Sequence, residues 1–334
     1  MNIVFLIGNG FDINLGMETS YADFYDYYTS TYKNVVSEPV SRLMTSIAQY
    51  KNTNLWADLE RGLGEYAAQI GTTEELREVY FHLNDALKNY LTFQVPDKKY
   101  LTANGAAKLK VDLFQPFHGF KPRLRQDIVG FMNPGGSTTD SVNIITFNYT
   151  DTIEKILSSS NFKLPFELGV KNVTNGTKRM LENIYHIHGT LKDSELIMGV
   201  NDKSQIKNER LAKDPSARSM LLKPETTINR GDLLDDRCEK VMNGADMYCL
   251  FGLSLGETDQ KWWNLLASRF TTANVHIIYY AHTDKPVVHS QDLWDMERGY
   301  CDLLLDKFAG KSADRDALAS RVHVLVNSKM FKLE

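Results

Sequence analysis

The sequence predicts an α/β fold in which a doubly wound, mostly parallel sheet is combined with a large helical insertion. Short apolar segments rich in Val, Ile and Tyr recur along the 334 residues, helical patterns separate them, and glycine-rich turns follow several of them. Parallel strands that are covered on both faces have nearly continuous apolar runs of this kind. The expected strands are Ile3–Ile7, Val142–Phe147, Met247–Phe251, Val275–Tyr280 and Val322–Val326.

Residues 20–140, between the first and second expected strands, contain helical signals alone. One of them is the capping box of Thr72 and Glu75, which precedes apolar residues at helical spacing. We therefore expect a helical lobe, residues 20–140, inserted into a single domain that spans residues 1–334.

Two polar segments are expected to be connections between regular elements. Residues 174–178, TNGTK, have the signature of a tight turn and are expected to close a hairpin that leads into ENIYHIHG. Residues 201–215 are polar and charged, and we expect them to form an exposed loop.

The composition argues against several classes of function. The formal net charge is -4 with mixed signs, so we expect no general nucleic-acid binding. No apolar run approaches the ~18–20 residues that cross a bilayer, and the first residues lack the pattern of a signal peptide, so we expect a cytoplasmic protein without a membrane partner. The three cysteines are far apart and form no CxxC pair, which fits neither a disulfide framework nor a structural zinc site.

A glycine turn, LIGNGFDINLG, follows the first expected strand. A strand, a glycine turn and a helix together can present backbone N–H groups to phosphate. Gly8 and Gly10 fit the dinucleotide pattern GxGxxG, but Ile13 occupies the third glycine position, and no GK[ST] of a phosphate-binding P-loop follows. A nucleotide-binding turn and a turn that needs glycine only for its dihedral angles both remain open.

Two further polar clusters follow expected strands. In ITFNYTDTIE, Asn148 is placed to hold a ribose hydroxyl or a water, or to cap the next helix. In YHIHGT, His188 is the better candidate for a catalytic base because Gly189 ends the strand and leaves room for a ligand, whereas His186 is expected to be structural. A metal site at these histidines would need a third ligand, and no motif supplies one, so we expect no metal.

The stretch LFGLSLGETD repeats the pattern of the opening turn, with Gly252, Ser254 and Gly256 between a strand and a helix capped near Asp259. Its hydroxyl and N–H groups suit a second phosphate or ribose contact, although a plain strand–helix turn has the same pattern. Because the carboxyl ends of parallel strands meet at one edge of a sheet, we expect all these clusters to converge.

The motifs GNGFDINLGMETSYADF, NLWADLE, ITFNYTDTIE, HIHG and GLSLGETD, in this order, resemble the AbiH family of bacterial phage abortive-infection proteins over nearly the whole chain. More distantly they resemble the sirtuin-like superfamily, which binds NAD. The resemblance implies a Rossmann-like sheet of the sirtuin-like or DHS-like type.

The resemblance also implies roles for matching residues. Gly8, Asn9 and Gly10 look like the loop that lies against the NAD pyrophosphate, and Gly252, Ser254 and Leu255 look like a later phosphate and ribose contact. In sum, it implies catalytic roles for His188 and Asn148, and NAD-binding roles for Gly8, Asn9, Gly10, Phe11, Asp12, Asp151, Gly252, Ser254 and Asp259. The sirtuin pattern has an acid two positions after the asparagine, where this chain has Thr150 followed by Asp151.

The function implied is anti-phage defence by hydrolysis of NAD+ to nicotinamide and ADP-ribose, with NAD as substrate. The chain lacks the four-cysteine zinc module of a sirtuin deacetylase. The alternatives are a non-enzymatic sensor of NAD or ADP-ribose and a nuclease-type toxin. For the nuclease, Asp58 and Glu60 are two residues apart and are expected on different sides of a helix. The expected partners are a second copy or a defence protein, and a phage-derived trigger.

Overall fold

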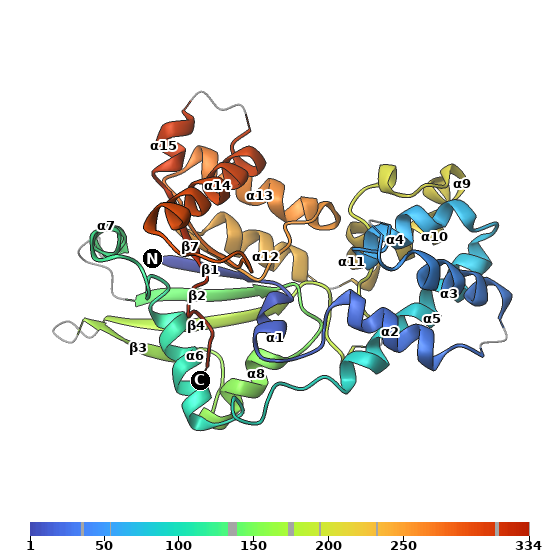
Figure 1. Ribbon diagram of the computed structural model, residues 1–334, viewed down its shortest axis with the longest axis horizontal. Coiled ribbons are helices and arrows are strands. Elements are labelled where there is room, and N and C mark those ends of the chain that lie inside the picture. Colours follow the sequence, from blue (N-terminus) through green and yellow to red (C-terminus); the bar gives the residue numbers. More distant parts are fainter. Residues whose placement is uncertain are drawn as a thin grey trace.

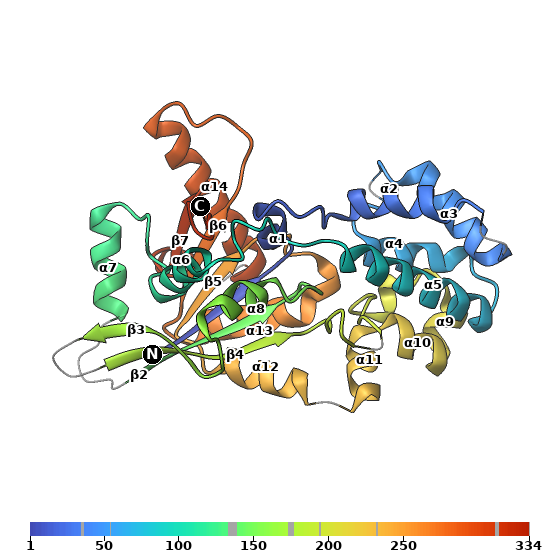
Figure 2. The same cartoon turned by 90° about the horizontal axis from the view of Figure 1, so that it is seen from below.

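The computed structural model describes residues 1–34, 37–53, 55–132, 139–172, 177–193, 195–231, 233–310 and 314–333. It has two parts, a body built around a β-sheet and a helical lobe beside the ends of the strands (Figure 1). The view turned by 90° shows the same separation (Figure 2).

The sheet of the body has seven strands in the order β3-β4-β2-β1-β5-β6-β7. All neighbouring strands in this order are parallel except β3 and β4, which are antiparallel. The strands are β1 Asn2–Ile7, β2 Thr139–Thr146, β3 Phe166–Asn172, β4 Thr177–His186, β5 Met247–Phe251, β6 His276–Ala281 and β7 Val322–Val326. The five expected strands are therefore present, and the mostly parallel α/β sheet is confirmed.

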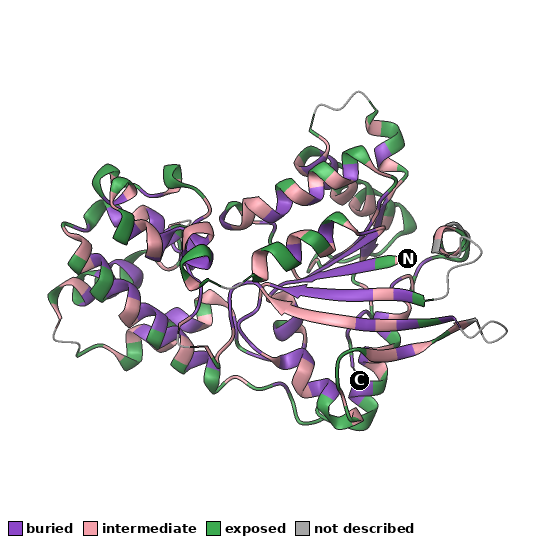
Figure 3. Ribbon diagram, turned by 180° about the vertical axis from the view of Figure 1, so that it is seen from behind, coloured by how far each residue is buried: buried purple, intermediate pink, exposed green. Residues whose placement is uncertain are grey.

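Helices cover both faces of this sheet, and the alternation of side chains along β1 explains how. Ile3, Phe5 and Ile7 pack into one hydrophobic cluster, while Val4 and Leu6 pack into another on the opposite face. The first face is covered by α1 Gly10–Asn14, α6 Ala103–Phe114, α7 Pro122–Met132 and α8 Thr152–Leu157 with η2 Ser158–Ser160. The second is covered by α12 Leu234–Asn243, α13 Gln260–Thr272, which follows η4 Glu257–Asp259, α14 Ser290–Phe308 and α15 Arg315–Ala319. Coloured by burial, the central strands are almost entirely buried (Figure 3).

The lobe has a hydrophobic core of its own, to which two separate stretches of the chain contribute. The first stretch forms α2 Tyr21–Thr31, α3 Glu38–Tyr50, α4 Leu59–Tyr66, η1 Ala67–Gln69 and α5 Thr73–Thr92. The second forms η3 Lys203–Gln205, α9 Glu209–Lys213, α10 Pro215–Leu221 and α11 Lys223–Arg230.

This arrangement differs from two expectations, and a third falls partly outside the described residues. The predicted lobe, residues 20–140, is too long, because α6 and α7 pack on the body. Residues 201–215 are not an exposed loop: they include two short helices, and Ile206 and Leu211 are buried in the core of the lobe. Two apolar residues in a polar segment are too few to reveal this. Of the predicted hairpin turn, residues 174–176 lie outside the described residues, although β3 and β4 on either side are antiparallel.

The turns that follow β1 and β5 are in direct backbone contact. Gly8 N–H donates to Phe251 O at 2.9 Å, and Gly10 N–H donates to Gly252 O at 3.0 Å. A Cβ on Gly8 would lie 2.5 Å from Gly252 O, and Gly252 has a φ of 65°. The glycines of both turns are thus required because one turn packs on the other, not only because of their dihedral angles.

We expect the substitution Gly252→Ala to lower the free energy of unfolding by roughly 2–4 kcal/mol, since the new Cβ would adopt a strained φ and clash with the Gly10 backbone. Gly299→Ala is the control. Nothing lies within 4 Å of a Cβ at Gly299 in α14, and alanine there gains about 0.5–1 kcal/mol of helix propensity. Urea denaturation measures both, and equal effects of the two substitutions would contradict the packing of the turns.

Candidate functional site

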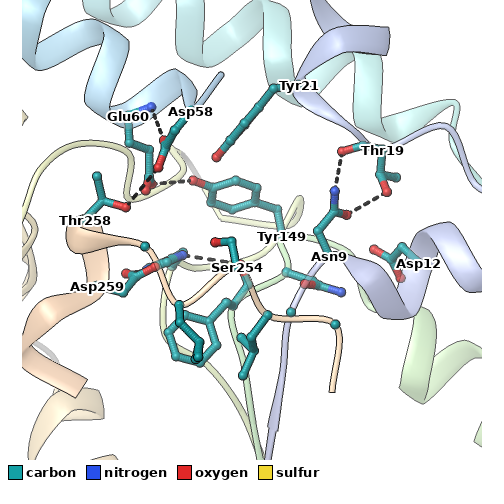
Figure 4. Close-up of a pocket in the computed structure, with 18 of the residues that line it drawn as sticks. Asn9, Asp12, Thr19, Tyr21, Asp58, Glu60, Tyr149, Ser254, Thr258 and Asp259 are labelled. Atoms are coloured by element: carbon teal, nitrogen blue, oxygen red, sulfur yellow. Dashed lines mark hydrogen bonds and ion pairs between the residues drawn. The ribbon is translucent and has the colours of Figure 1, made fainter. Parts of the chain in front are cut away.

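A pocket of about 370 Å³ lies between the carboxyl ends of the central strands and the lobe. The body contributes the turns after β1 and β5 and the segments after β2 and β4, and the lobe contributes residues of α2, α4 and α5. Figure 4 shows how side chains from both parts point toward the same space. In this sheet β2 lies beside β1 on one side, and β5 lies beside β1 on the other, so the direction in which strands are added reverses at β1. Ligands of open α/β sheets bind at such a reversal.

Most of the predicted site residues meet here. Those that line the pocket are Gly8, Asn9, Asp12, Asn148, His188, Gly252, Ser254 and Asp259. Their convergence follows from the register, because Ile7 pairs with both Thr146 and Phe251 and the three central strands therefore end level with one another. What these residues bind stays a prediction.

Gly10, Phe11 and Asp151 are not among the residues that line the pocket. Gly10 packs against Gly252, and the fully buried Phe11 ring packs on Phe251 in the core of the body. The carboxylate of Asp151 is held outside by Lys155 at 2.7 Å and by a second lysine. The Asp151 side chain is therefore directed toward these two lysines and not into the pocket.

Asn9 shapes the pocket through a contact with the segment that enters the lobe. Its Nδ2 donates to Thr19 O at 2.8 Å, and the Thr19 hydroxyl donates to Asn9 Oδ1 at 2.6 Å. Figure 4 shows the two side chains facing each other. Asn9 therefore fixes the path from α1 to α2, a structural task that the glycine motif alone does not reveal.

Asp12 and Asn148 both line the pocket, and each has one buried oxygen without a hydrogen-bond partner among the described residues. Asp12 is 1% exposed, and its Oδ2 accepts a hydrogen bond from the Thr150 hydroxyl. Within the described residues, Asp12 Oδ1 and Asn148 Oδ1 are buried without a hydrogen-bond partner. Buried polar atoms are nearly always hydrogen-bonded, and these two oxygens retain the capacity to accept a hydrogen bond.

Burial raises the pKa of the Asp12 carboxyl to about 6, although the hydroxyls of Thr150 and Thr152 act in the opposite direction. This side chain therefore changes its protonation state close to neutral pH, which is unusual for an aspartate. A titrating carboxyl in the wall of a pocket is a candidate for acid–base chemistry.

His188 lies in the pocket wall, but both ring nitrogens are engaged. Nδ1 donates to Phe147 O at 3.3 Å, while Nε2 lies 2.9 Å from Asp259 Oδ1 and 3.2 Å from Lys223 Nζ. The geometry therefore favours a role in holding Asp259 over that of a free base. His186 bonds Glu154 at 2.9 Å, in agreement with the structural role expected of it. Burial alone would lower the pKa of His186, but Glu154 and other partners raise it.

A buried ion cluster joins the lobe to the body beside the pocket. Lys223 of α11 donates to Glu60 Oε2 of α4 at 2.6 Å and to Asp259 Oδ1 of the body at 2.8 Å. Tyr149 approaches the other oxygen of Glu60 at 3.3 Å, as Figure 4 shows. One ammonium group therefore contacts two carboxylates that come from different parts of the fold.

Lys223 and Asp259 hold each other ionised, whereas Glu60 behaves differently. Burial alone would lower the pKa of Lys223, but the carboxylates of Asp259 and Glu60 raise it above its usual value. Burial would raise the pKa of Asp259, but Lys223 and His188 hold it well below its usual range. For Glu60, burial outweighs the attraction of Lys223, and its pKa is raised.

Lys223 was not predicted from the sequence, and the expectation for Asp58 and Glu60 was wrong. The two residues do not lie on different sides of a helix, since Asp58 caps α4 from outside and accepts from Glu60 N at 2.9 Å. Both carboxylates line the pocket. The sequence signal that could have indicated a buried Lys223 is its position at the start of a helix, between the apolar Leu221 and Leu222 and Pro224.

The pocket is acidic. Asp12, Asp58, Glu60 and Asp259 contribute carboxyl groups, while no Lys or Arg is among its lining residues in the described part of the chain. Aromatic side chains, including Tyr21 and Tyr149, form much of the remaining wall. Within the described residues, no group of three or more His, Cys, Asp or Glu is placed to hold a metal ion.

Fold and site together define an α/β protein with an acidic pocket between the carboxyl edge of a mostly parallel sheet and a helical lobe. The sequence model of the family described as bacteriophage abortive infection AbiH matches residues 4–281, so the chain belongs to the AbiH family. The match includes every residue that lines the pocket. No curated protein matches the sequence. None of the helices in the described ranges is long and apolar enough to cross a membrane.

We expect Lys223→Met to lower the free energy of unfolding by about 3–5 kcal/mol, because it leaves two buried carboxylates without their cation. Lys213→Met is the control. Lys213 pairs with Glu209 on the surface, and its loss should cost less than about 0.5 kcal/mol. Chemical denaturation measures both. A loss below about 1 kcal/mol for Lys223→Met would show that the cluster does not hold the lobe to the body.

Proposed function

We propose that this AbiH protein acts in abortive infection by hydrolysing NAD+ to nicotinamide and ADP-ribose in the pocket. The observation that carries the proposal is the pair of buried, unpartnered acceptors, Asp12 Oδ1 and Asn148 Oδ1, at the end of the central strands. Sugar hydroxyls, and a water held beside the sugar, are donors that would satisfy these oxygens, and NAD+ carries such hydroxyls on two riboses.

The topology supports a dinucleotide as the ligand. Without the antiparallel β3, the parallel strands follow the order β4-β2-β1-β5-β6-β7, in which the chain winds first to one side of β1 and then to the other. Rossmann-like sheets that bind dinucleotides have this order, and their ligand lies at the carboxyl ends where the direction reverses. The pocket occupies the corresponding place in this protein.

The charge of the pocket suits the bond that would be broken. The nicotinamide ring of NAD+ is cationic, and when it leaves as a neutral molecule the positive charge develops on the ribose. A carboxylate beside that sugar stabilises the charge, and Lys223 and His188 keep Asp259 ionised for this purpose. A pocket built to hold a polyanionic nucleic acid would instead be lined by cationic side chains.

The diphosphate requires donors other than lysine or arginine side chains. The turn between β5 and α13 offers them, since it carries the exposed Ser254 hydroxyl and a run of peptide groups at the pocket. Leu255 in this turn has a φ of 55°, which is costly for a residue with a side chain. Such strained residues cluster where backbone groups hold a ligand.

In this mechanism each residue has a separate task. Asn148 holds the ribose or the attacking water, Asp259 stabilises the charge on the sugar, and His188 fixes the Asp259 carboxylate. Positioning of the reactants and electrostatic stabilisation supply the rate, since the departing base needs no covalent help.

We expect purified protein to release nicotinamide from NAD+, tested both alone and with lysate from phage-infected cells as a source of the trigger. Asn148→Ala and Asp259→Asn should each reduce release by roughly 10²–10³-fold, since each removes a group aimed at the sugar. Asn264→Ala, at an exposed position of α13, is the control and should release nicotinamide like the unmodified protein.

Three results would contradict the proposal. They are the absence of release under both conditions, normal release by the two pocket variants, and tight binding of NAD+ without cleavage. The last of these would identify the chain as a sensor of the dinucleotide.

A further inference from the structure

Asp12 differs from the other carboxylates of the pocket in having a buried oxygen, Oδ1, that accepts no hydrogen bond from the described residues, although the Thr152 hydroxyl acts on this carboxylate. Both oxygens of Glu60 have partners, Lys223 and Tyr149. Asp58 accepts from two peptide N–H groups of α4 and from the Thr258 hydroxyl. The remaining carboxylate, Asp259, is paired with Lys223 and His188.

Hydrolysis also requires a group that accepts a proton, and the geometry leaves few choices. An ion-paired carboxylate such as Asp259 is a weak base. His188 has one nitrogen on Phe147 O and the other on Asp259. Among the described residues that line the pocket, Asp12 Oδ1 is the carboxylate oxygen that is both buried and free to accept.

We propose that Asp12 is the catalytic base of the NAD+ hydrolysis proposed above, accepting through Oδ1 a proton from the attacking water while Thr150 holds Oδ2. The water oxygen forms a bond to C1′ of the nicotinamide ribose. The bond from C1′ to the ring nitrogen breaks, and its electron pair neutralises the nicotinamide. The proton of the water passes to Asp12 and then to solvent, so that one NAD+ and one water give nicotinamide, ADP-ribose and a proton.

The surroundings of Asp12 set the pH at which it works. Burial raises its pKa to about 6, whereas the hydroxyls of Thr150 and Thr152, His186 of β4 and Lys155 of α8 act to lower it. The carboxylate is therefore mostly ionised at pH 7 and yet more basic than an exposed aspartate. A base with a pKa just below the working pH is efficient, because it is both deprotonated and able to hold the proton.

The test is the pH dependence of nicotinamide release between pH 5 and 8.5 for the unmodified protein, Asp12→Asn and Asp112→Asn. We expect kcat of the unmodified protein to fall as the pH decreases through about 6, because Asp12 then becomes protonated. Asp12→Asn should lower kcat by roughly 10²–10⁴-fold and change KM much less. It should also lose the acidic limb of the pH profile, which is the fall of kcat as the pH decreases through about 6.

Asp112 is a matched control. It is buried in α6, away from the pocket, and burial raises its pKa to about 6 as well. Asp112→Asn should therefore keep both kcat and the acidic limb. Thr150→Val is a second test that leaves Asp12 in place: without the hydroxyl the pKa of Asp12 rises, so the acidic limb of the pH profile should move to higher pH.

The outcomes separate the two proposals. If the unmodified protein releases no nicotinamide with or without the infected-cell lysate, the proposed hydrolysis fails. If it does release nicotinamide, but Asp12→Asn stays within threefold of its kcat and keeps the acidic limb, the role of Asp12 alone fails. An unmoved limb in Thr150→Val likewise contradicts this role. Binding of ADP-ribose to Asp12→Asn, measured by calorimetry, shows whether a loss of kcat reflects chemistry or a damaged pocket.

Discussion

The contact of Lys223 with Glu60 and Asp259 is the interaction on which the site depends. Lys223 belongs to α11 of the lobe, and its ammonium group pairs with Glu60 of α4 and with Asp259 of the body. The residue is 7% exposed and lies beside the pocket. Buried ion pairs add little to stability when compared with apolar replacements, but the loss of one partner is costly. Lys223 therefore fixes the position of the lobe over the sheet edge and at the same time keeps Asp259 ionised.

The packing of one glycine turn on another has a similar double effect. Gly8, Gly10 and Gly252 allow the ends of β1 and β5 to approach at backbone distance, which places the residues after both strands at one pocket. The acceptors of Asp12 and Asn148 then lie on the same side of that contact. The central strands end at the same height because Ile7 pairs with both Thr146 and Phe251. This common end explains both why glycine is required in the turns and why the polar side chains converge.

The sequence predicted the sheet and much of the pocket because both depend on local patterns. Continuous apolar runs mark buried parallel strands, and polar residues directly after such runs must meet at one edge. Lys223 and the hydrogen bonds of His188 were not predictable in this way, since they arise from contacts between segments far apart in the chain. The second stretch of the lobe was missed for a related reason: its buried residues, such as Ile206 and Leu211, are surrounded by polar ones.

We have proposed that a sugar of NAD+ and the water that attacks it satisfy the two unpartnered oxygens of the pocket. The most direct measurement is a crystal structure of the protein with bound ADP-ribose. We expect the C1′ hydroxyl of the ribose, whose oxygen comes from the attacking water, within hydrogen-bond distance of Asp12 Oδ1, and another ribose hydroxyl within hydrogen-bond distance of Asn148 Oδ1, with the diphosphate against the turn that carries Ser254. A ligand bound elsewhere, or one whose riboses point away from both oxygens, would contradict it.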